Sequence, residues 1–206
     1  MLTERRTLHD TLFLDIQDAQ ITVIQLACSA DGVPFRFLND LDIDSKSGDV
    51  YFTDSSSQYH RWEFREIDMK DRSGRLMKYN PNTIRVTVLV RGLSFANGVG
   101  LSKNKDFIFV AETTLYQVLR YWLTSPKAGI TEVFMKLTGR PDIINRNAYG
   151  DFWIAQNPTK PIKINEGGMI LESLHTNDIV DCSDVNEIHN KLWIGSVIQK
   201  YIIYTS

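Results

Sequence analysis

The chain has 206 residues, of which 43% are hydrophobic and 11% aromatic, enough for one domain with a sizeable core. Its 23 Lys and Arg residues nearly balance 25 Asp and Glu residues, so the basic surface typical of nucleic-acid binding is not expected. No apolar stretch approaches the ~20 residues of a membrane span, and residues 1–10 do not have the apolar core of a secretory signal.

Four segments share one pattern, in which a polar residue and a short apolar stretch lead into a turn and then an aromatic-aliphatic strand. They begin at Asn39, Asn97, Pro141 and Cys182. Their starts are about 40 to 58 residues apart, close to the repeat of one propeller blade. Each segment is therefore predicted to form a hairpin with alternating apolar positions.

Further strands are predicted between these hairpins, in residues 74–90 and 118–137, so that each repeat receives four strands. Pro81 and Asn82 predict a tight turn, because proline fixes φ and asparagine tolerates unusual turn geometry. Residues 58–72 have mixed charges and few β-branched residues, which favours a short helix or a lid-like insertion. The pattern predicts an all-β propeller, with a β-sandwich as the alternative.

Several ordered stretches together resemble the strictosidine synthase-like proteins of plants, which are related to adipocyte plasma membrane-associated protein and distantly to paraoxonase and gluconolactonase propellers. These stretches are residues 29–59, 73–83, 95–112, 118–129 and 145–155. The resemblance implies a six-bladed β-propeller, of which residues 1–206 form a single partial domain of about four blades. On this reading the first blade and part of the second are missing, and the region typical of the family covers about residues 31–123.

Asn39, Asn97 and Asp142 occupy the same phase of the repeat, at the start of the strand that lines the channel of a propeller. Their oxygen atoms are the ligand type that Ca²⁺ requires. The alternative is that these residues only cap turns before strands. The resemblance implies calcium ligands at all three positions, but Ile143 stands where paraoxonases have a second amide ligand and a completing glutamate is missing, so we expect weak binding.

Strictosidine synthase uses a glutamate as acid and base, and the resemblance aligns Ser183 with that position. A hydroxyl cannot shuttle protons near neutral pH as a tuned carboxylate can, so strictosidine synthase activity is not expected. Asp184 and Glu187 are nearby carboxylates, and Glu187 is predicted to lie in the hairpin turn. A shift of one residue along a strand would turn such a side chain to the other face.

Relatedness to paraoxonases implies instead a calcium-dependent hydrolase of small esters or lactones, with a histidine that activates water. His60 is the candidate for that role. The other histidines, which are expected in solvated segments or too far from the matching pattern, are His9, His175 and His189. Two alternatives stay open: amine-aldehyde condensation, and a non-catalytic binding module. The resemblance also implies a secretory location, in the vacuole, the endoplasmic reticulum or outside the cell.

Two further side-chain pairs call for an interpretation. Cys28 and Cys182 do not have the spacing of a zinc site, which leaves a disulfide or simple burial. Glu112 and Arg120 flank a predicted hairpin, where we expect a structural ion pair across the strands.

Overall fold

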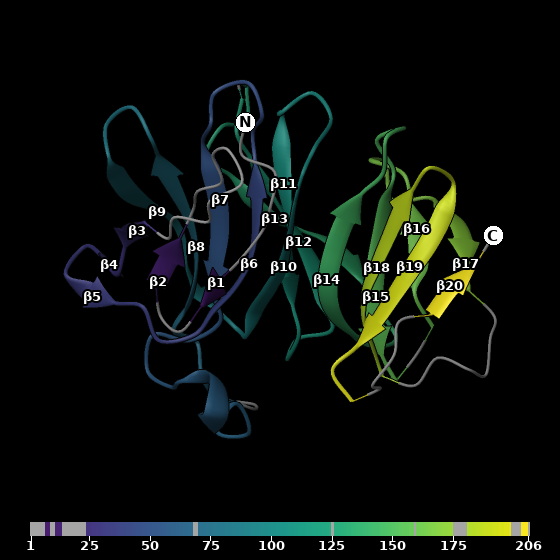
Figure 1. Cartoon of the computed structure of the whole chain (residues 1–206), viewed down its shortest axis with the longest axis horizontal. Helices are drawn as coiled ribbons and strands as arrows, with labels where there is room; N and C mark the ends of the chain where they lie inside the picture. The colour runs from purple at the N-terminus through teal and green to yellow at the C-terminus, as the bar shows by residue number, and fades with distance from the viewer. Residues whose placement is uncertain are drawn as a thin grey trace. The chain divides into compact units, whose positions relative to one another are not determined.

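The computed structural model is all-β apart from one short 3-10 helix among the residues that it describes (Figure 1). It describes residues 7–8, 11–13, 24–67, 70–124, 126–158, 160–174, 181–198 and 203–205. The chain divides into two compact units, residues 1–97 and 98–206. Within the described residues, no helix is long and apolar enough to cross a bilayer.

The first unit is built around one four-stranded antiparallel sheet. Its strands, in spatial order, are β6 (Leu38–Ile43), β7 (Val50–Asp54), β8 (Gly74–Asn80) and β9 (Arg85–Leu93). Smaller sheets precede it, formed by β1 (Thr7–Leu8), β2 (Thr11–Phe13) and β3 (Gln25–Ala27), and by β4 (Ser29–Ala30) and β5 (Val33–Pro34). The predicted turn joins β8 to β9, where Asn80 Oδ1 accepts the N–H groups of Asn82 and Thr83 at 3.0 Å.

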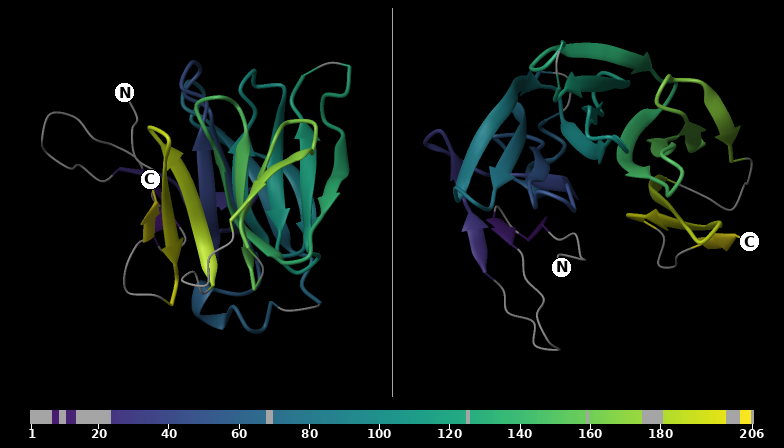
Figure 2. Two further views of the ribbon diagram at one scale, coloured as in Figure 1. Left: turned by 90° about the vertical axis from the view of Figure 1, so that its right-hand side faces the viewer. Right: turned by 90° about the horizontal axis from the view of Figure 1, so that it is seen from above.

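The second unit contains two more four-stranded sheets and a three-stranded one, and Figure 2 shows from above how the strands of each sheet twist. The first sheet comprises β10 (Ala96–Leu101), whose first two residues belong to the first unit, β11 (Phe107–Glu112), β12 (Gln117–Trp122) and β13 (Thr131–Lys136). The second comprises β14 (Arg140–Arg146), β15 (Phe152–Asn157), β16 (Ile162–Ile164) and β17 (Ile170–Ser173). The third comprises β18 (Cys182–Ile188), β19 (Lys191–Ser196) and β20 (Ile203–Thr205).

The repeat predicted from the sequence is confirmed in these sheets. The first strands β6, β10, β14 and β18 each begin at the predicted start or one residue before it. Three of the sheets have the expected four strands, and the last has three among the residues described. The predicted insertion after β7 contains the 3-10 helix η1 (Arg61–Glu63).

The second strands are buried more completely than their sequences suggest. Alternating apolar positions predict one buried face, but every residue of β7 and β11 is buried. The reason is that both faces of each strand are covered. In β7, Phe52 packs with Phe35 edge to face at 5.7 Å, while the adjacent Thr53, on the other face, donates to the Asn97 carbonyl. In β11, Phe109 contacts Phe152 at 4.9 Å, and Ile108, on the other face, is fully buried.

The first strands carry β-bulges near their N-terminal ends. The register with the second strand shifts between Leu38 and Leu41 in β6, and between Pro141 and Ile144 in β14. In β18 it shifts between Cys182 and Asp184. A bulge removes residues from the regular ladder and re-aims their side chains, so residues 39–40, 142–143 and 183 have orientations that plain alternation does not set.

The predicted ion pair between Glu112 and Arg120 is wrong. Glu112 lies opposite Gln117 and accepts its side-chain N–H at 2.5 Å. Arg120 lies opposite Phe109 and forms its ion pair with Glu132 of β13, at 2.8 Å. Glu112 and Arg120 are therefore three ladder positions apart and on opposite faces of the sheet, a register that residue types alone did not reveal.

Candidate functional site

Asn39 and Asn97, two of the predicted calcium ligands, lie at the starts of β6 and β10 and are linked through the end of β7. The Asn39 amide nitrogen donates to Ser55 Oγ at 2.9 Å, and that hydroxyl donates to the carbonyl of Ala96 at 2.7 Å. The hydroxyl of Thr53 donates to the carbonyl of Asn97, also at 2.7 Å. Two hydroxyl groups therefore hold the starts of these strands together in the first unit.

One of these bonds sets the orientation of the Asn39 amide. The amide nitrogen donates to Ser55, and the amide oxygen is the side-chain atom of the type that coordinates a cation. Asn39 is half-buried, and Asn97 is only 4% exposed. Because the Asn39 amide is already held by Ser55, little side-chain freedom would be lost if it coordinated a cation.

Asp142, the third predicted ligand, lies in the β14 bulge of the second unit. The preceding carbonyl, that of Pro141, accepts the hydroxyl of Thr113 at 2.7 Å. A Cβ atom on Gly98 would meet the carbonyl oxygen of Asp142 at 2.4 Å, so only glycine allows the backbones of β10 and β14 to come this close. The Asp142 side chain is half-buried.

The charge of Asp142 also acts on a neighbouring thiol. Burial, the negative charge of Asp184 and, more weakly, that of Asp142 raise the pKa of Cys182 to about 12. Cys182 is 2% exposed, whereas Cys28 is exposed, and neither forms a disulfide. Of the two interpretations of the cysteines, burial therefore holds for Cys182, and Cys28 is an exposed free thiol.

Asn39 and Asn97 lie in the first unit and Asp142 in the second, and their joint role as calcium ligands stays a prediction. Each side chain offers an oxygen atom, the donor type that hard cations prefer, and only Asp142 carries a formal negative charge. Calcium takes six to eight oxygen ligands, so water or substrate oxygens would complete the coordination. Among the described residues, no three His, Cys, Asp or Glu side chains form a denser metal-binding group.

Ser183, which is predicted to stand at the position of the glutamate of strictosidine synthase, occupies the β18 bulge and is 9% exposed. Its hydroxyl donates to the carbonyl of Gly195 at 3.3 Å, a bond to the neighbouring strand. Asp184 accepts the amide N–H of Asn145 at 2.5 Å. Ser183 is thus a strand residue hydrogen-bonded to β19, and the carboxylate beside it is tied to β14.

The predicted turn position of Glu187 is wrong. Glu187 lies within β18, opposite Leu192. Burial works to raise its pKa, but hydrogen bonds from Asn147 and Trp153 and the ion pair with Lys163, at 3.1 Å, together hold the pKa of Glu187 below its usual range. The turn begins two residues later than expected, so this carboxylate joins a structural cluster on the sheet.

His60, the candidate base, lies immediately before η1 and is held on two sides. Arg36 Nη1 lies 2.8 Å from His60 Nε2, and because arginine only donates, Nε2 is the acceptor in this contact. The imidazole stacks on Trp62, with ring centroids 4.4 Å apart and an interplanar angle of 9°. The nitrogen that accepts from Arg36 is thus engaged in a contact within the protein.

The other histidines have varied positions. His189 is exposed in the β18–β19 turn with a φ of 51°, as predicted for a turn residue. His9 and His175 lie outside the described residues.

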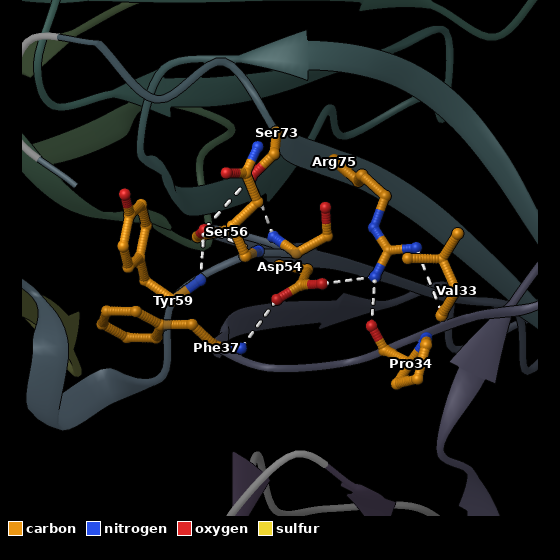
Figure 3. Close-up of polar contacts among 10 residues, drawn as sticks. Val33, Pro34, Phe37, Asp54, Ser56, Tyr59, Ser73 and Arg75 are labelled. Carbon is orange, nitrogen blue, oxygen red and sulfur yellow. Dashed lines mark hydrogen bonds and ion pairs between the residues drawn. The ribbon is translucent and has the colours of Figure 1, made fainter. Parts of the chain in front are cut away.

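Sequence reasoning missed a buried charged pair in the first unit, Asp54 of β7 and Arg75 of β8, which Figure 3 shows between Pro34 of β5 and the backbone of Phe37. The carboxylate oxygen and guanidinium nitrogen are 2.5 Å apart, and the side chains are 0% and 3% exposed. Arg75 also donates to the carbonyl of Pro34 at 3.0 Å, and Asp54 accepts the Phe37 N–H at 2.8 Å.

The environment of Asp54 has opposing effects on its ionisation. Burial raises the pKa of Asp54, and the bonds from Arg75 and Phe37 only partly reverse this, so the pKa stays above its ordinary value. Asp54 and Arg75 directly face each other in the β7–β8 register. A charge in each of two neighbouring buried strands was the available signal for this pair.

A surface pocket of about 320 Å³ lies in the second unit, lined by turn residues. It lies at the β10–β11, β14–β15 and β16–β17 turns, whereas Asp142 lies near the other end of β14. The lining residues are Lys103, Asn104, Tyr149, Gly150, Asp151, Asn165, Glu166 and Gly167. None of the predicted site residues contributes to this pocket.

Comparison with known proteins identifies the relatives of the chain. The strictosidine synthase family model matches residues 39–126. Strictosidine synthase-like 10 of Arabidopsis thaliana is 37% identical over 220 aligned residues, covering 86% of this chain and 59% of the relative. Strictosidine synthase of Catharanthus roseus is 40% identical over 136 residues, covering 65% of this chain and 38% of the enzyme. The chain thus spans under two thirds of the length of these relatives.

Solved structures match the fold over a similar share. A gluconolactonase from Xanthomonas campestris superposes with a TM-score of 0.69 at 18% identity, covering 87% of this chain and 60% of that one. The calcium-binding protein regucalcin from Agrobacterium tumefaciens gives 0.58 at 16% identity, covering 79% and 55%. The four-stranded sheets are therefore those of a six-bladed β-propeller, covered in part. The chain belongs to the strictosidine synthase-like family, which is structurally related to the gluconolactonase and regucalcin propellers.

Proposed function

We propose that the chain is part of a calcium-dependent hydrolase of small esters or lactones. The observation that supports this proposal most directly is the set of β-bulges at the starts of the first strands. Residues 39–40 and 142–143 lie outside the regular ladder. Two of them, Asn39 and Asp142, have side-chain oxygen atoms that could act as calcium ligands. The similarity to a gluconolactonase and to calcium-binding regucalcin points in the same direction.

Asn39, Asn97 and Asp142 would hold the ion. Bound calcium would polarise the carbonyl oxygen of an ester or lactone and so favour attack by water. The bond from Asn39 to Ser55 keeps the amide oriented, and Asp142 supplies the negative charge. His60 stays a candidate for the base, although its bond with Arg36 favours a structural role.

The position of Ser183 argues against amine-aldehyde condensation, the second candidate function. Strictosidine synthase activity needs an acid-base group at this position, and a serine hydroxyl bonded to the carbonyl of Gly195 does not provide one. We therefore expect no condensation of tryptamine with secologanin by this chain. Formation of the condensed product, detected by mass spectrometry, would favour the second candidate.

The hydrolase proposal is tested by the release of phenol from phenyl acetate and by the opening of δ-valerolactone, each with calcium and with excess EDTA. We expect turnover only with calcium. Asn39→Ala and Asp142→Asn should lower kcat/KM about 10- to 100-fold, because each removes part of the ligand set. Asn104→Ala, in an exposed turn, is the matched control and should change nothing.

Calcium-independent turnover, or full activity of Asp142→Asn, would overturn the proposal. Absence of turnover in this chain and in a form extended to the length of its relatives would do the same. Calcium binding without turnover in both forms would instead support a non-catalytic binding module, the third candidate.

A further inference from the structure

The segment between β7 and β8 is held in place by hydrogen bonds at its base. Ser56 Oγ accepts the N–H groups of Gln58 and Tyr59, both at 3.0 Å, and lies 3.1 Å from the hydroxyl of Ser73 (Figure 3). The η1 turn is closed by the His60 N–H, which donates to Glu63 Oε2 at 2.9 Å. A segment with such bonds at both ends presents its side chains in a defined arrangement.

The same segment is attached to the start of β6, next to Asn39. Arg61 Nη2 donates to the carbonyl of Leu38, the residue before Asn39, at 2.6 Å. The Arg61 guanidinium also lies over the ring of Phe37, at 4.5 Å from its centroid. Arg36 contacts His60 from the same stretch of chain. Three contacts therefore bring η1 to the end of β6 where Asn39 lies.

Trp62 is the exposed part of this arrangement. One face of its indole stacks on the imidazole of His60, and the side chain is nevertheless 68% exposed. A large aromatic ring left in water forgoes the stabilisation that burial would give. Because His60 is fixed by Arg36, the indole is supported from one side while most of its surface remains accessible.

We propose that Trp62, supported by His60, is a stacking surface that selects ligands with a planar aromatic group. A second ring can lie on the indole with little loss of side-chain entropy, because the indole is already ordered. Arg36 contacts the His60 ring with a positive charge, and the Glu63 carboxylate accepts the His60 backbone N–H, so the charges nearest the stack balance and a neutral aryl group is favoured. The inference rests on the proposed function for its location at the Asn39 end of β6.

The kinetic test compares phenyl acetate with methyl acetate, which share the acyl group and differ in the aromatic ring. Trp62→Ala should lower the ratio of kcat/KM for phenyl to methyl acetate about 3- to 10-fold, and Trp62→Phe should restore most of it. Phe64→Ala removes a neighbouring exposed aromatic ring, 51% exposed, and should leave the ratio unchanged. Because Trp62 is exposed, the thermal unfolding midpoint of each variant should match that of the parent.

A binding measurement separates failure of this inference from failure of the proposed function. Saturation-transfer NMR with phenol and cyclohexanol reports contact with an aromatic and a saturated ring of similar size. We expect transfer to phenol that falls in Trp62→Ala, and weaker transfer to cyclohexanol. If this pattern holds while no ester is hydrolysed, the stacking surface stands and the hydrolase does not.

Two results would overturn the stacking surface. One is an unchanged phenol signal, or an unchanged phenyl-to-methyl ratio, in Trp62→Ala. The other is an equal effect of Phe64→Ala, which would show that any exposed aromatic ring of the segment serves.

Discussion

Burial works against ionisation at the Asp54–Arg75 ion pair. The distance of 2.5 Å gives strong attraction, yet the net pKa shift of Asp54 is upward because desolvation is the largest effect. Taking two charges out of water can cost more than their attraction returns. The pair therefore holds β5 at Pro34 and the Phe37 backbone in place, and is not a source of large net stability.

We predict that Arg75→Met lowers the free energy of unfolding by about 3 to 5 kcal/mol at about pH 7, because it leaves Asp54 buried without its countercharge. The matched control is Arg91→Met, which breaks the exposed ion pair with Asp31 and should cost at most about 1 kcal/mol. Urea unfolding followed by circular dichroism measures both. Equal losses for the two variants would contradict the prediction.

The same variant has a predicted pH dependence. The pKa of Asp54 is raised in the folded state, so its contribution favours folding at low pH and is lost as the pH rises above the ordinary value of 3.8 through the folded pKa. Arg75→Met removes two effects that lower this pKa and so raises it further. The gap in unfolding free energy between parent and variant should narrow from about pH 7 to about pH 4. A gap that widens on acidification would be inconsistent with this account.

The two cysteines should differ in reactivity. The thiolate is the reactive form, and the Cys182 pKa of about 12 together with 2% exposure keeps it protonated and shielded. We predict that a disulfide reagent such as DTNB labels one thiol rapidly in the native chain and two in denaturant. Cys28→Ser should abolish the rapid phase. A rapid phase that survives in that variant would show that Cys182 is accessible.

At the scale of the elements, the close approach of β10 to β14 depends on one glycine. A Cβ on Gly98 would lie 2.4 Å from the Asp142 carbonyl oxygen and 2.5 Å from the Ile144 nitrogen, both rigid backbone atoms. We predict that Gly98→Ala lowers the free energy of unfolding by about 1 to 3 kcal/mol, as overpacking typically does. Gly167→Ala, in an exposed turn where the nearest contact is a side-chain oxygen at 3.3 Å, should stay within about 0.5 kcal/mol. Equal unfolding midpoints in urea for the two variants would show that the strands can separate without cost.

The positions of the strands could be predicted because the same residue pattern recurs at similar intervals along the sequence. Asn39, Asn97, Pro141 and Cys182 marked the first strands to within one residue, and Pro81 marked a turn. Register could not be predicted in the same way. The pairing of Glu112 with Gln117 depends on where the turn between β11 and β12 closes, and Glu187 lies in β18 because the next turn falls at residues 189–190.

At the scale of the whole molecule, the family and the type of fold could be predicted, because ordered stretches over most of the chain match known relatives. The shared position of Asn39, Asn97 and Asp142 in the repeat also marked them as candidate calcium ligands, a role that stays a prediction. The surroundings of the site were not visible: the bonds of the Ser55 and Thr53 hydroxyls, the contact of Arg36 with His60 and the ion pair of Arg75 with Asp54 all join residues distant in sequence. Contacts of this kind depend on how strands pack, which residue types do not specify.

Calcium should stabilise the whole chain if the proposed ligands bind it. A ligand that binds only the native state adds RT ln(1 + [L]/Kd), about 2.7 kcal/mol at 100 times Kd. We predict that the unfolding midpoint rises with calcium concentration, measured by differential scanning fluorimetry. The rise should be lost in Asn97→Ala and kept in Asn104→Ala. An identical rise in both variants would place the ion elsewhere.

The bulges at the starts of β6, β14 and β18 have a consequence for how activity diverges in this family. A residue in a bulge already stands outside the ladder of backbone bonds, so exchanging its side chain leaves the strand pairing intact. A change of side chain at Ser183 therefore need not disturb the sheet. Reactions can be lost or gained at such positions while the scaffold stays constant, so a shared fold among these relatives is a poor guide to a shared substrate.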